Sequence, residues 1–156
     1  MGPITAPSLP LLAPALPLTV SVSSLDNSVI NAHAGSEERF TLAADVLFAF
    51  NRANLSSAAR QRLVLVAARL RQAHPASARV DGYTDAKGQP AYNLALSRRR
   101  AAAVRTALTQ ILGPRPTFTV TGHGAADPVA ANTSPDGSDN PAGRALNRRV
   151  TIAFRA

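Results

Sequence analysis

The chain has 156 residues, of which 46% are hydrophobic and only 4% aromatic, a composition typical of one α/β or α+β domain with a tail. It contains no cysteine, which excludes disulfide bonds, thiolate catalysis and cysteine-based zinc sites. The formal net charge of +8 comes almost entirely from arginine and predicts an anionic partner, without choosing among nucleic acid, an acidic membrane surface and an anionic polymer. No apolar run approaches the roughly 18–20 residues of a membrane span.

The first 17 residues are rich in proline and contain no charged side chain. Proline at this density favours an extended segment without internal hydrogen bonds. A signal peptide would need a basic start and an uninterrupted apolar run, and this segment has neither. We therefore expect residues 1–17 to form an extended segment or linker.

Alternation of apolar and polar residues predicts the strands that follow. The predicted strands cover residues 18–23, 28–33, 39–50, 77–85, 116–124 and 148–154. The first two would form a leading hairpin within 18–38. In the third strand, Val46, Phe48 and Phe50 would share one face. The last two strands would be joined by a long Gly-, Asn-, Asp- and Pro-rich loop over 126–147, and a loop of that length is usually functional or mobile.

Two helices are predicted between these strands from the helical spacing of apolar side chains. The first begins after Ser56 or Ser57, either of which can serve as the N-cap, and it ends at Pro75. The second begins near Pro90 and stops at Gly113. Polar outer faces on the last strands predict that helices cover one face of the sheet only. The fold class is therefore α+β, a two-layer sandwich with an N-terminal β-hairpin.

The second predicted helix has an arginine on its apolar face. At about 100° per residue, Arg100 falls on the same stripe as Leu96 and Val104, and Asn93 joins that stripe two turns earlier. A charge on a buried face is costly unless it is paired. Asp85 ends the preceding strand, and a strand end lies close to the first turns of the helix after it. We therefore expect Asp85 and Arg100 to face a shared pocket.

A carboxylate and a guanidinium held slightly apart are suited to a zwitterion. The carboxylate would bind an ammonium group, and the guanidinium would bind a carboxylate through two parallel hydrogen bonds. Asn93 would hydrogen-bond to either group. The alternative is a structural Asp–Arg pair that fixes the strand to the helix, which is the commoner arrangement when residue types alone are considered.

Three stretches combine these residues in a distinctive order and spacing: DVLFAFNRANL, GYTDAKGQPAYNLALSRRRAAAV and GRALNRRVTIAF. Together they resemble the OmpA-like peptidoglycan-binding domain family over residues 40–156. The resemblance implies one domain over 18–156, with a βαβαβ-type core at 39–156 after the hairpin at 18–38. It also implies non-covalent, non-catalytic binding to the diaminopimelate of the peptidoglycan stem peptide.

The resemblance also implies a binding site, residue by residue. Its members are Phe50, Asn51, Thr84, Asp85, Asn93, Leu96, Arg100 and Arg148. Asp85 would bind the ammonium group of the ligand and Arg100 the adjacent carboxylate. The resemblance also places Arg148 at the rim. Strand alternation agrees with that choice, because Arg148 shares its strand face with Val150 whereas Arg149 points the other way.

The chain departs from the family pattern at two places. Asn51 stands where the family often has aspartate, so the position keeps a hydrogen-bond acceptor and loses a charge. The loop over 132–142 is longer than the usual link in the family. Both differences concern the surroundings of the proposed pocket and leave Asp85 and Arg100 in register with the family motif.

Other kinds of site receive little support from the sequence. The histidines lack the spacing of metal ligands, so we expect neither a metal nor another cofactor. Glu37 and Glu38 form no convincing catalytic pair. The arginine run over 98–100 has no interleaved aromatic residues for base stacking, which disfavours nucleic acid as a partner.

The sequence as a whole therefore predicts an extracytoplasmic protein of the cell envelope, periplasmic or secreted. We expect it to bind peptidoglycan and to tether a protein or an envelope layer to the cell wall, without enzymatic activity. The main alternative is an assembly domain of a larger envelope complex whose pocket is vestigial. A wall hydrolase and a nucleic-acid-binding protein are further alternatives.

Overall fold

The computed structural model describes residues 18–22, 29–34 and 36–155, so the linker predicted over 1–17 lies outside the described residues. The strands of the described part are β1 (Leu18–Val22), β2 (Val29–Ala34), β3 (Glu37–Ala43), β4 (Ser77–Tyr83), β5 (Thr117–Gly122) and β6 (Arg149–Arg155). Its helices are α1 (Ala44–Leu47), α2 (Ser57–Ala73), α3 (Pro90–Leu112) and α4 (Pro141–Asn147).

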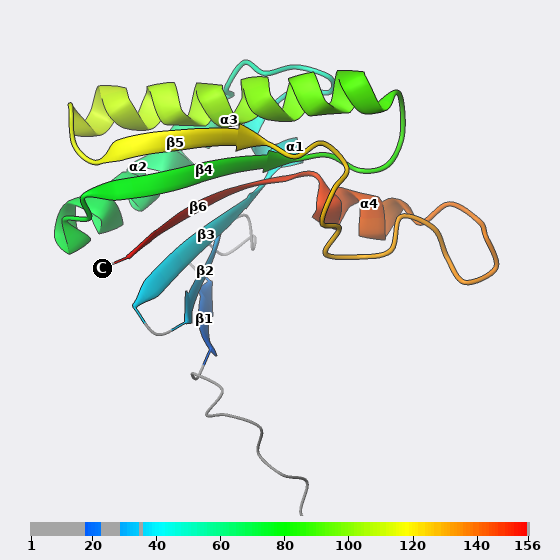
Figure 1. Ribbon diagram of the computed structural model, residues 1–156, viewed down its shortest axis with the longest axis horizontal. Helices are drawn as coiled ribbons and strands as arrows, with labels where there is room; N and C mark the ends of the chain where they lie inside the picture. The colour runs from blue at the N-terminus through cyan, green and yellow to red at the C-terminus, as the bar shows by residue number, and fades with distance from the viewer. Residues whose placement is uncertain (1–17, 23–28, 35, 156) are drawn as a thin grey trace, which may run out of the picture.

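The strands form one sheet in the order β1-β2-β3-β6-β4-β5 (Figure 1). Strands β4 and β5 are parallel, and all other neighbours are antiparallel. The last strand of the chain, β6, therefore lies in the middle of the sheet, between β3 and β4. Helices α2 and α3 cover one face of the sheet (Figure 1), so the predicted two-layer α+β sandwich with a leading antiparallel pair of strands is confirmed.

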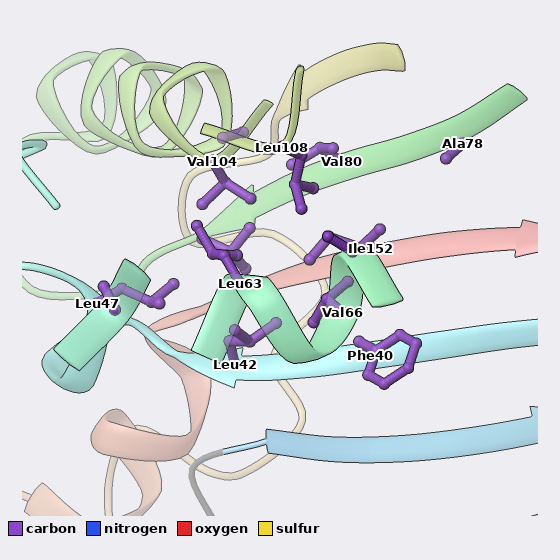
Figure 2. Packing of buried hydrophobic residues seen from close by; sticks show 14 of the residues in the cluster. Phe40, Leu42, Leu47, Leu63, Val66, Ala78, Val80, Val104, Leu108 and Ile152 are labelled. Carbon is purple, nitrogen blue, oxygen red and sulfur yellow. The ribbon is translucent and has the colours of Figure 1, made fainter. Parts of the chain in front are cut away.

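The core lies between the helix layer and the inner face of the sheet. Figure 2 shows side chains of α2 and α3 meeting those of the central strands. The largest of these buried apolar residues include Leu42, Leu63, Leu108, Val80 and Ile152. Burying each such side chain stabilises the fold by about 1.5–3 kcal/mol. This layer fixes α3 against β4, and the start of α3 meets the end of β4 where the candidate site lies.

The ends of the two long helices follow the local signals in the sequence. The Ser56 hydroxyl accepts a hydrogen bond from the Ala59 amide at 3.0 Å, which caps α2. His74 adopts a left-handed conformation at the C-terminus of α2, with a φ of 51°. Helix α3 begins with Pro90 in its first turn and ends at Gly113, which also has a positive φ, of 85°.

The prediction of one strand over 39–50 is wrong in its second half. Strand β3 ends at Ala43, and residues 44–47 form the short helix α1. Phe48 and Phe50 do not share a buried face, because 4% of Phe48 is exposed and 88% of Phe50. The Ala44 amide donates to the Arg148 carbonyl at 2.9 Å, and the Phe48 amide donates to the Ala44 carbonyl at 2.8 Å. These hydrogen bonds turn the chain despite its strand-like alternation.

The prediction of an irregular loop over 126–147 also needs correction, because its last seven residues form α4. The side-chain oxygen of Asn140 accepts a hydrogen bond from the Gly143 amide at 3.2 Å, and Pro141 occupies the first turn. Asparagine followed by proline is a helix-start signal. The many glycine and proline residues before it hide this signal in the sequence.

Candidate functional site

A cavity of about 330 Å³ lies where the end of β4, the first half of α3, α1 and α4 meet. All eight residues of the sequence-predicted site line this cavity: Phe50, Asn51, Thr84, Asp85, Asn93, Leu96, Arg100 and Arg148. Six more lining residues were missed by the sequence prediction: Asp45, Phe48, Lys87, Gly88, Tyr92 and Arg144. The structure thus brings the predicted residues together, and it places further charged and aromatic side chains beside them in the same cavity.

Asp85 is held firmly at the end of β4. One carboxylate oxygen accepts a hydrogen bond from the Lys87 amide at 2.9 Å. The other accepts from Arg148 at 2.7 Å and from Arg144 at 3.4 Å. The Thr84 hydroxyl donates to the Asp85 carbonyl at 2.9 Å, which fixes the backbone of the same turn. Asp85 is therefore a buried carboxylate already bonded to two arginines, and neither of them is Arg100, the partner in the structural pair that the sequence left as an alternative.

Arg144 on α4 and Arg148, which directly follows this helix, each bridge a pair of carboxylates. Arg148 donates to both oxygens of Asp45 at 3.0 and 2.9 Å, in addition to its bond with Asp85. Arg144 binds both oxygens of Asp139 at 2.7 and 2.6 Å. The hydrogen bonds that Arg148 donates to Asp45 and Asp85 raise its pKa, and those that Arg144 donates to Asp139 and Asp85 raise the pKa of Arg144. These paired charges form a rigid rim around the carboxylate of Asp85.

Arg100 differs from the two rim arginines because its charge is buried without a carboxylate partner. Only 5% of the residue is exposed, and burial lowers its pKa. Its Nε donates to the Arg52 carbonyl at 3.0 Å, and its guanidinium carbon lies 5.2 Å from the centroid of the Phe48 ring. Among the described residues, the two terminal nitrogens of Arg100 have no hydrogen-bond partner. A guanidinium with unpaired donors at the wall of a cavity is available to an anion.

The side-chain nitrogen of Asn93 has a structural role, whereas its side-chain oxygen is available to a ligand. Its side-chain nitrogen donates to the Lys87 carbonyl at 2.9 Å and holds the turn after β4. Gly88 in that turn has a φ of 93°, a conformation that other residues rarely adopt. The side-chain oxygen of Asn93 accepts no hydrogen bond from the described residues, although the residue is buried. This oxygen is a second unpaired polar group of the cavity.

The entrance of the cavity has two exposed aromatic rings. Phe50 is almost fully exposed, and Tyr92 is partly exposed. Asn51 has a φ of 54°, and asparagine tolerates this left-handed conformation better than most residues. The turn at Asn51 thereby presents Phe50 at the cavity edge, on a different side of the chain from Phe48.

One of the missed residues, Arg144, had a signal in the sequence. It lies four residues before Arg148, and residues at that spacing share a helix face. The signal was lost because residues 126–147 were predicted as a loop. No comparable pattern indicates Asp45 or Tyr92, because their place at the cavity depends on how α1 and α3 pack.

The opposite face of the sheet holds a second polar cluster. The guanidinium carbon of Arg149 lies 3.7 Å from the centroid of the Tyr83 ring, and that ring stacks on His123 at 4.7 Å. His123 also contacts the Asp81 carboxylate at 2.9 Å. Consecutive arginines thus point to opposite faces, with Arg148 in the cavity and Arg149 in this cluster.

The described part of the chain has neither a metal-binding cluster nor a membrane-spanning helix. No group of three or more histidine and acidic side chains there has an arrangement that would hold a metal ion. None of the described helices combines the length and the apolar character required to cross a bilayer.

Comparison with known proteins places these features in a family. Residues 47–141 match the model of the OmpA family. The chain is 47% identical over 98 residues to outer membrane protein A of Yersinia pseudotuberculosis, a match that covers 62% of this chain and 28% of that protein. The chain therefore spans less than a third of that relative, and it covers 36% of outer membrane protein P5 of Haemophilus influenzae.

Solved structures show the same fold. The cell wall anchor of the T6SS from Pseudomonas aeruginosa aligns with a TM-score of 0.72 and 30% identity, over 84% of this chain and 90% of that one. The peptidoglycan-associated lipoprotein from Burkholderia pseudomallei aligns with a TM-score of 0.58 and 30% identity, over 70% of this chain and 88% of that one. The likeness therefore extends over most of each solved chain.

Proposed function

The chain belongs to the OmpA family, and on this premise we propose that its cavity binds peptidoglycan non-covalently through the diaminopimelate of the stem peptide. The names of two similar solved proteins, a cell wall anchor and a peptidoglycan-associated lipoprotein, support this proposal. The domain would tether a protein or an envelope layer to the cell wall, in an extracytoplasmic location and without catalysis.

The observation that supports this function most directly is the unpaired guanidinium of Arg100. Diaminopimelate ends in a carbon that bears both a carboxylate and an ammonium group. The carboxylate would accept two parallel hydrogen bonds from the terminal nitrogens of Arg100. The ammonium group would donate to Asp85 and to the side-chain oxygen of Asn93. Each of the two unpaired polar groups of the cavity would then have a partner.

The charges around the cavity favour a ligand with an excess of carboxylate. Its lining has two carboxylates, Asp45 and Asp85, against four cations, Lys87, Arg100, Arg144 and Arg148. Asp85 already accepts three hydrogen bonds, and a carboxylate has about four acceptor positions. Asp85 therefore has room for about one more donor, and we expect Arg100 to contribute more to ligand affinity than Asp85.

The decisive experiment compares two kinds of insoluble peptidoglycan in a sedimentation assay. Lysine-type peptidoglycan lacks the carboxylate that Arg100 would bind, so the wild-type chain should bind the diaminopimelate type at least about tenfold more tightly. Arg100→Lys keeps the charge and loses the paired donors, so it should weaken binding by about tenfold to a hundredfold. The matched control is Arg99→Lys, an exposed neighbour on the same helix, which should bind like the wild type.

Equal sedimentation of the wild type and Arg100→Lys would refute the pocket assignment, as would equal affinity for both kinds of peptidoglycan. Either result would favour the alternative of an assembly domain with a vestigial pocket. Release of soluble muropeptides during the assay would instead indicate a hydrolase. A shift of Asn93 and Asp85 resonances on addition of free diaminopimelate would independently support the proposed site.

A further inference from the structure

Helices α2 and α3 present an outward surface that is rich in arginine and has no acidic residue. Neither helix contains an aspartate or a glutamate in its sequence. The exposed arginines of this helix face are Arg60, Arg71, Arg98, Arg99 and Arg105. Among the residues that the structure describes, no ion pair is formed by Arg60, Arg98, Arg99 or Arg105. Much of the net positive charge is therefore uncompensated on one side of the molecule.

On the helices the part-buried Arg69 is paired, with the buried Glu38 carboxylate at 2.8 Å, whereas on the sheet side two exposed arginines have an acidic neighbour. Arg39 and Arg79 both lie near the Glu37 carboxylate, at 3.2 and 3.5 Å. Asp81 also lies on an outward position of β4. The positive charge is thus partly balanced there. A polyanion approaching the molecule would be attracted to the helix face.

The helix face also has two exposed apolar side chains, in the stretch of α2 that separates two of its arginines. On α2, 52% of Val64 and 45% of Leu65 are exposed, and both lie in sequence between Arg60 and Arg71. Exposed aliphatic groups flanked by arginine are typical of helices that lie in the interface of a membrane. Guanidinium groups also match phosphate oxygens through paired hydrogen bonds.

We propose that the helix face docks on the phosphate headgroups of an anionic phospholipid bilayer, with Val64 and Leu65 reaching the boundary of the acyl chains. Nucleic acid is disfavoured because α2 has no aromatic residue and the one aromatic residue of α3, Tyr92, lines the cavity. A soluble polyphosphate would supply the phosphates and would leave the apolar groups without a role.

This contact is compatible with an occupied cavity. Successive residues of a helix are about 100° apart, so Arg99 and Arg105 point away from the side of α3 that carries Asn93 and Arg100. The cavity lies at the end of the sheet near α4. Helices α2 and α3 cover one face of the sheet (Figure 1), and the helix face is the side of these helices that points away from the sheet. One domain can therefore rest on a bilayer and bind a second ligand at its end.

The test is flotation of the chain with vesicles of equimolar phosphatidylglycerol and phosphatidylcholine, compared with vesicles of phosphatidylcholine alone. The wild type should float with the anionic vesicles only. A triple variant, Arg60→Gln with Arg99→Gln and Arg105→Gln, should lose affinity by on the order of a hundredfold, given the usual effect of each basic residue near a charged membrane. Glutamine keeps a helix propensity close to that of arginine, so the helices should remain intact.

The matched control changes the net charge by the same amount on the sheet side, through Arg39→Gln with Arg79→Gln and Arg155→Gln. It should keep vesicle affinity within about threefold of the wild type, because sheet-side charges lie on the far side of the domain from the docked bilayer. Equal losses in both triple variants would show that only net charge matters and would overturn the proposal. Absence of any wild-type binding to anionic vesicles would overturn it as well.

Three further measurements test the nature of the contact and keep it separate from the pocket. Val64→Ser with Leu65→Ser should weaken vesicle binding severalfold, and unchanged vesicle binding together with equally tight binding of soluble polyphosphate or DNA would overturn the choice of a bilayer. Arg100→Lys should leave vesicle binding unaltered, because Arg100 lies inside the domain. Wild-type vesicle binding should also fall as salt is raised, and insensitivity to salt would contradict the phosphate contact.

Discussion

The chain buries two arginines at the same end of its sheet, on opposite faces, and the two are used differently. Arg100 and Arg149 are both almost inaccessible, and burial lowers the pKa of each. Each guanidinium also lies over an aromatic ring, Phe48 at 5.2 Å for Arg100 and Tyr83 at 3.7 Å for Arg149. Burial and ring contact therefore do not distinguish a binding residue from a structural one.

The distinction lies in the terminal nitrogens. Those of Arg149 donate to the carbonyl of Asn147 at 3.2 Å and to the carbonyl of Asp127 at 2.9 Å. Those of Arg100 face a cavity and have no partner among the described residues. A buried charge that is satisfied by main-chain carbonyls stabilises the fold, whereas a buried charge with unpaired donors is available to a ligand.

Substitution of Asn147 should have the largest effect on stability, because this residue supports both the cavity and the cluster around Arg149. Its fully buried side chain accepts hydrogen bonds from the amides of Val129 and Ala130 at 2.8 and 3.0 Å, and it donates to Ala130 and Asn132 at 2.9 and 3.1 Å. We expect Asn147→Ala to lower the free energy of unfolding by about 3–4 kcal/mol, since it removes four part-buried hydrogen bonds together. Urea denaturation measures this directly.

The same substitution should also affect the cavity and the cluster around Arg149 together, so that ligand binding and stability no longer change separately. Asn147 immediately precedes Arg148 of the cavity and Arg149 of the second cluster, so loss of its anchoring should displace both. Binding to diaminopimelate-type peptidoglycan should fall together with stability. The control is Asn54→Ala at an exposed position, and a loss below about 1 kcal/mol for Asn147→Ala would contradict the role given to this side chain.

Replacing each buried arginine by methionine should separate the two regions. Arg149→Met removes two charge-assisted hydrogen bonds and a close ring contact, so we expect stability to fall by about 2–3 kcal/mol with unchanged affinity per folded molecule. Arg100→Met removes one hydrogen bond, to the carbonyl of the exposed residue Arg52, and a longer ring contact with Phe48. Unlike Arg149→Met, it also removes a buried charge whose terminal nitrogens have no partner among the described residues. Its stability should stay within about 1 kcal/mol of the wild type, while peptidoglycan binding is lost.

Parallel urea titrations and sedimentation assays on the two methionine variants provide the measurement. A stability loss in Arg100→Met as large as that in Arg149→Met would show that the cavity arginine is structural after all. Conversely, weakened peptidoglycan binding in a fully folded Arg149→Met variant would show that the cluster on the other face contributes to the site.

Local periodicity predicted the centre of the pocket, whereas only the resemblance to the OmpA-like family predicted Phe50, Asn51, Thr84 and the ligand contact of Leu96. The helical stripe placed Arg100 beside Asn93, and the alternation of strand residues placed Arg148 and Arg149 on opposite faces. Both inferences depend only on backbone geometry that extends over several residues. The short helix α1 was missed for the same reason, because four residues are too few to establish a helical period and their apolar alternation resembled a strand.

The partners of Asp85 show where local reasoning ends. Arg144 and Arg148 reach Asp85 across about 60 residues of sequence, through the position of α4 against the end of β4. No spacing rule connects residues that are so far apart. The sequence therefore predicted which side chains face the cavity better than it predicted how their charges are already paired.

The smallest expected effect concerns Asp139, which lies in the long loop before α4 and holds Arg144 at the rim. Its hydrogen bond with Arg144 lowers the pKa of Asp139. A carboxyl whose pKa is lowered by folding stabilises the fold above its ordinary pKa of about 3.9, and this contribution is lost as the pH falls through the lowered value. Asp139→Asn would remove this contribution and loosen the position of Arg144 at the rim. Because the Asp139 side chain is exposed, we expect peptidoglycan binding to weaken by less than about threefold at neutral pH.

The difference in unfolding free energy between Asp139→Asn and the wild type should disappear in strongly acidic solution, where the wild-type carboxyl is itself protonated. Unfolding measured from neutral pH down through the titration of Asp139 provides the comparison. Asp136→Asn is the matched control, because that exposed carboxylate bonds Ser138 and does not touch Arg144. If both variants reduced binding equally, the loop charge and not the positioning of Arg144 would be responsible. An effect confined to Asp139→Asn would show that the rim around Asp85 extends into the loop, whereas Arg149 on the other face would keep its hydrogen bonds at every pH tested.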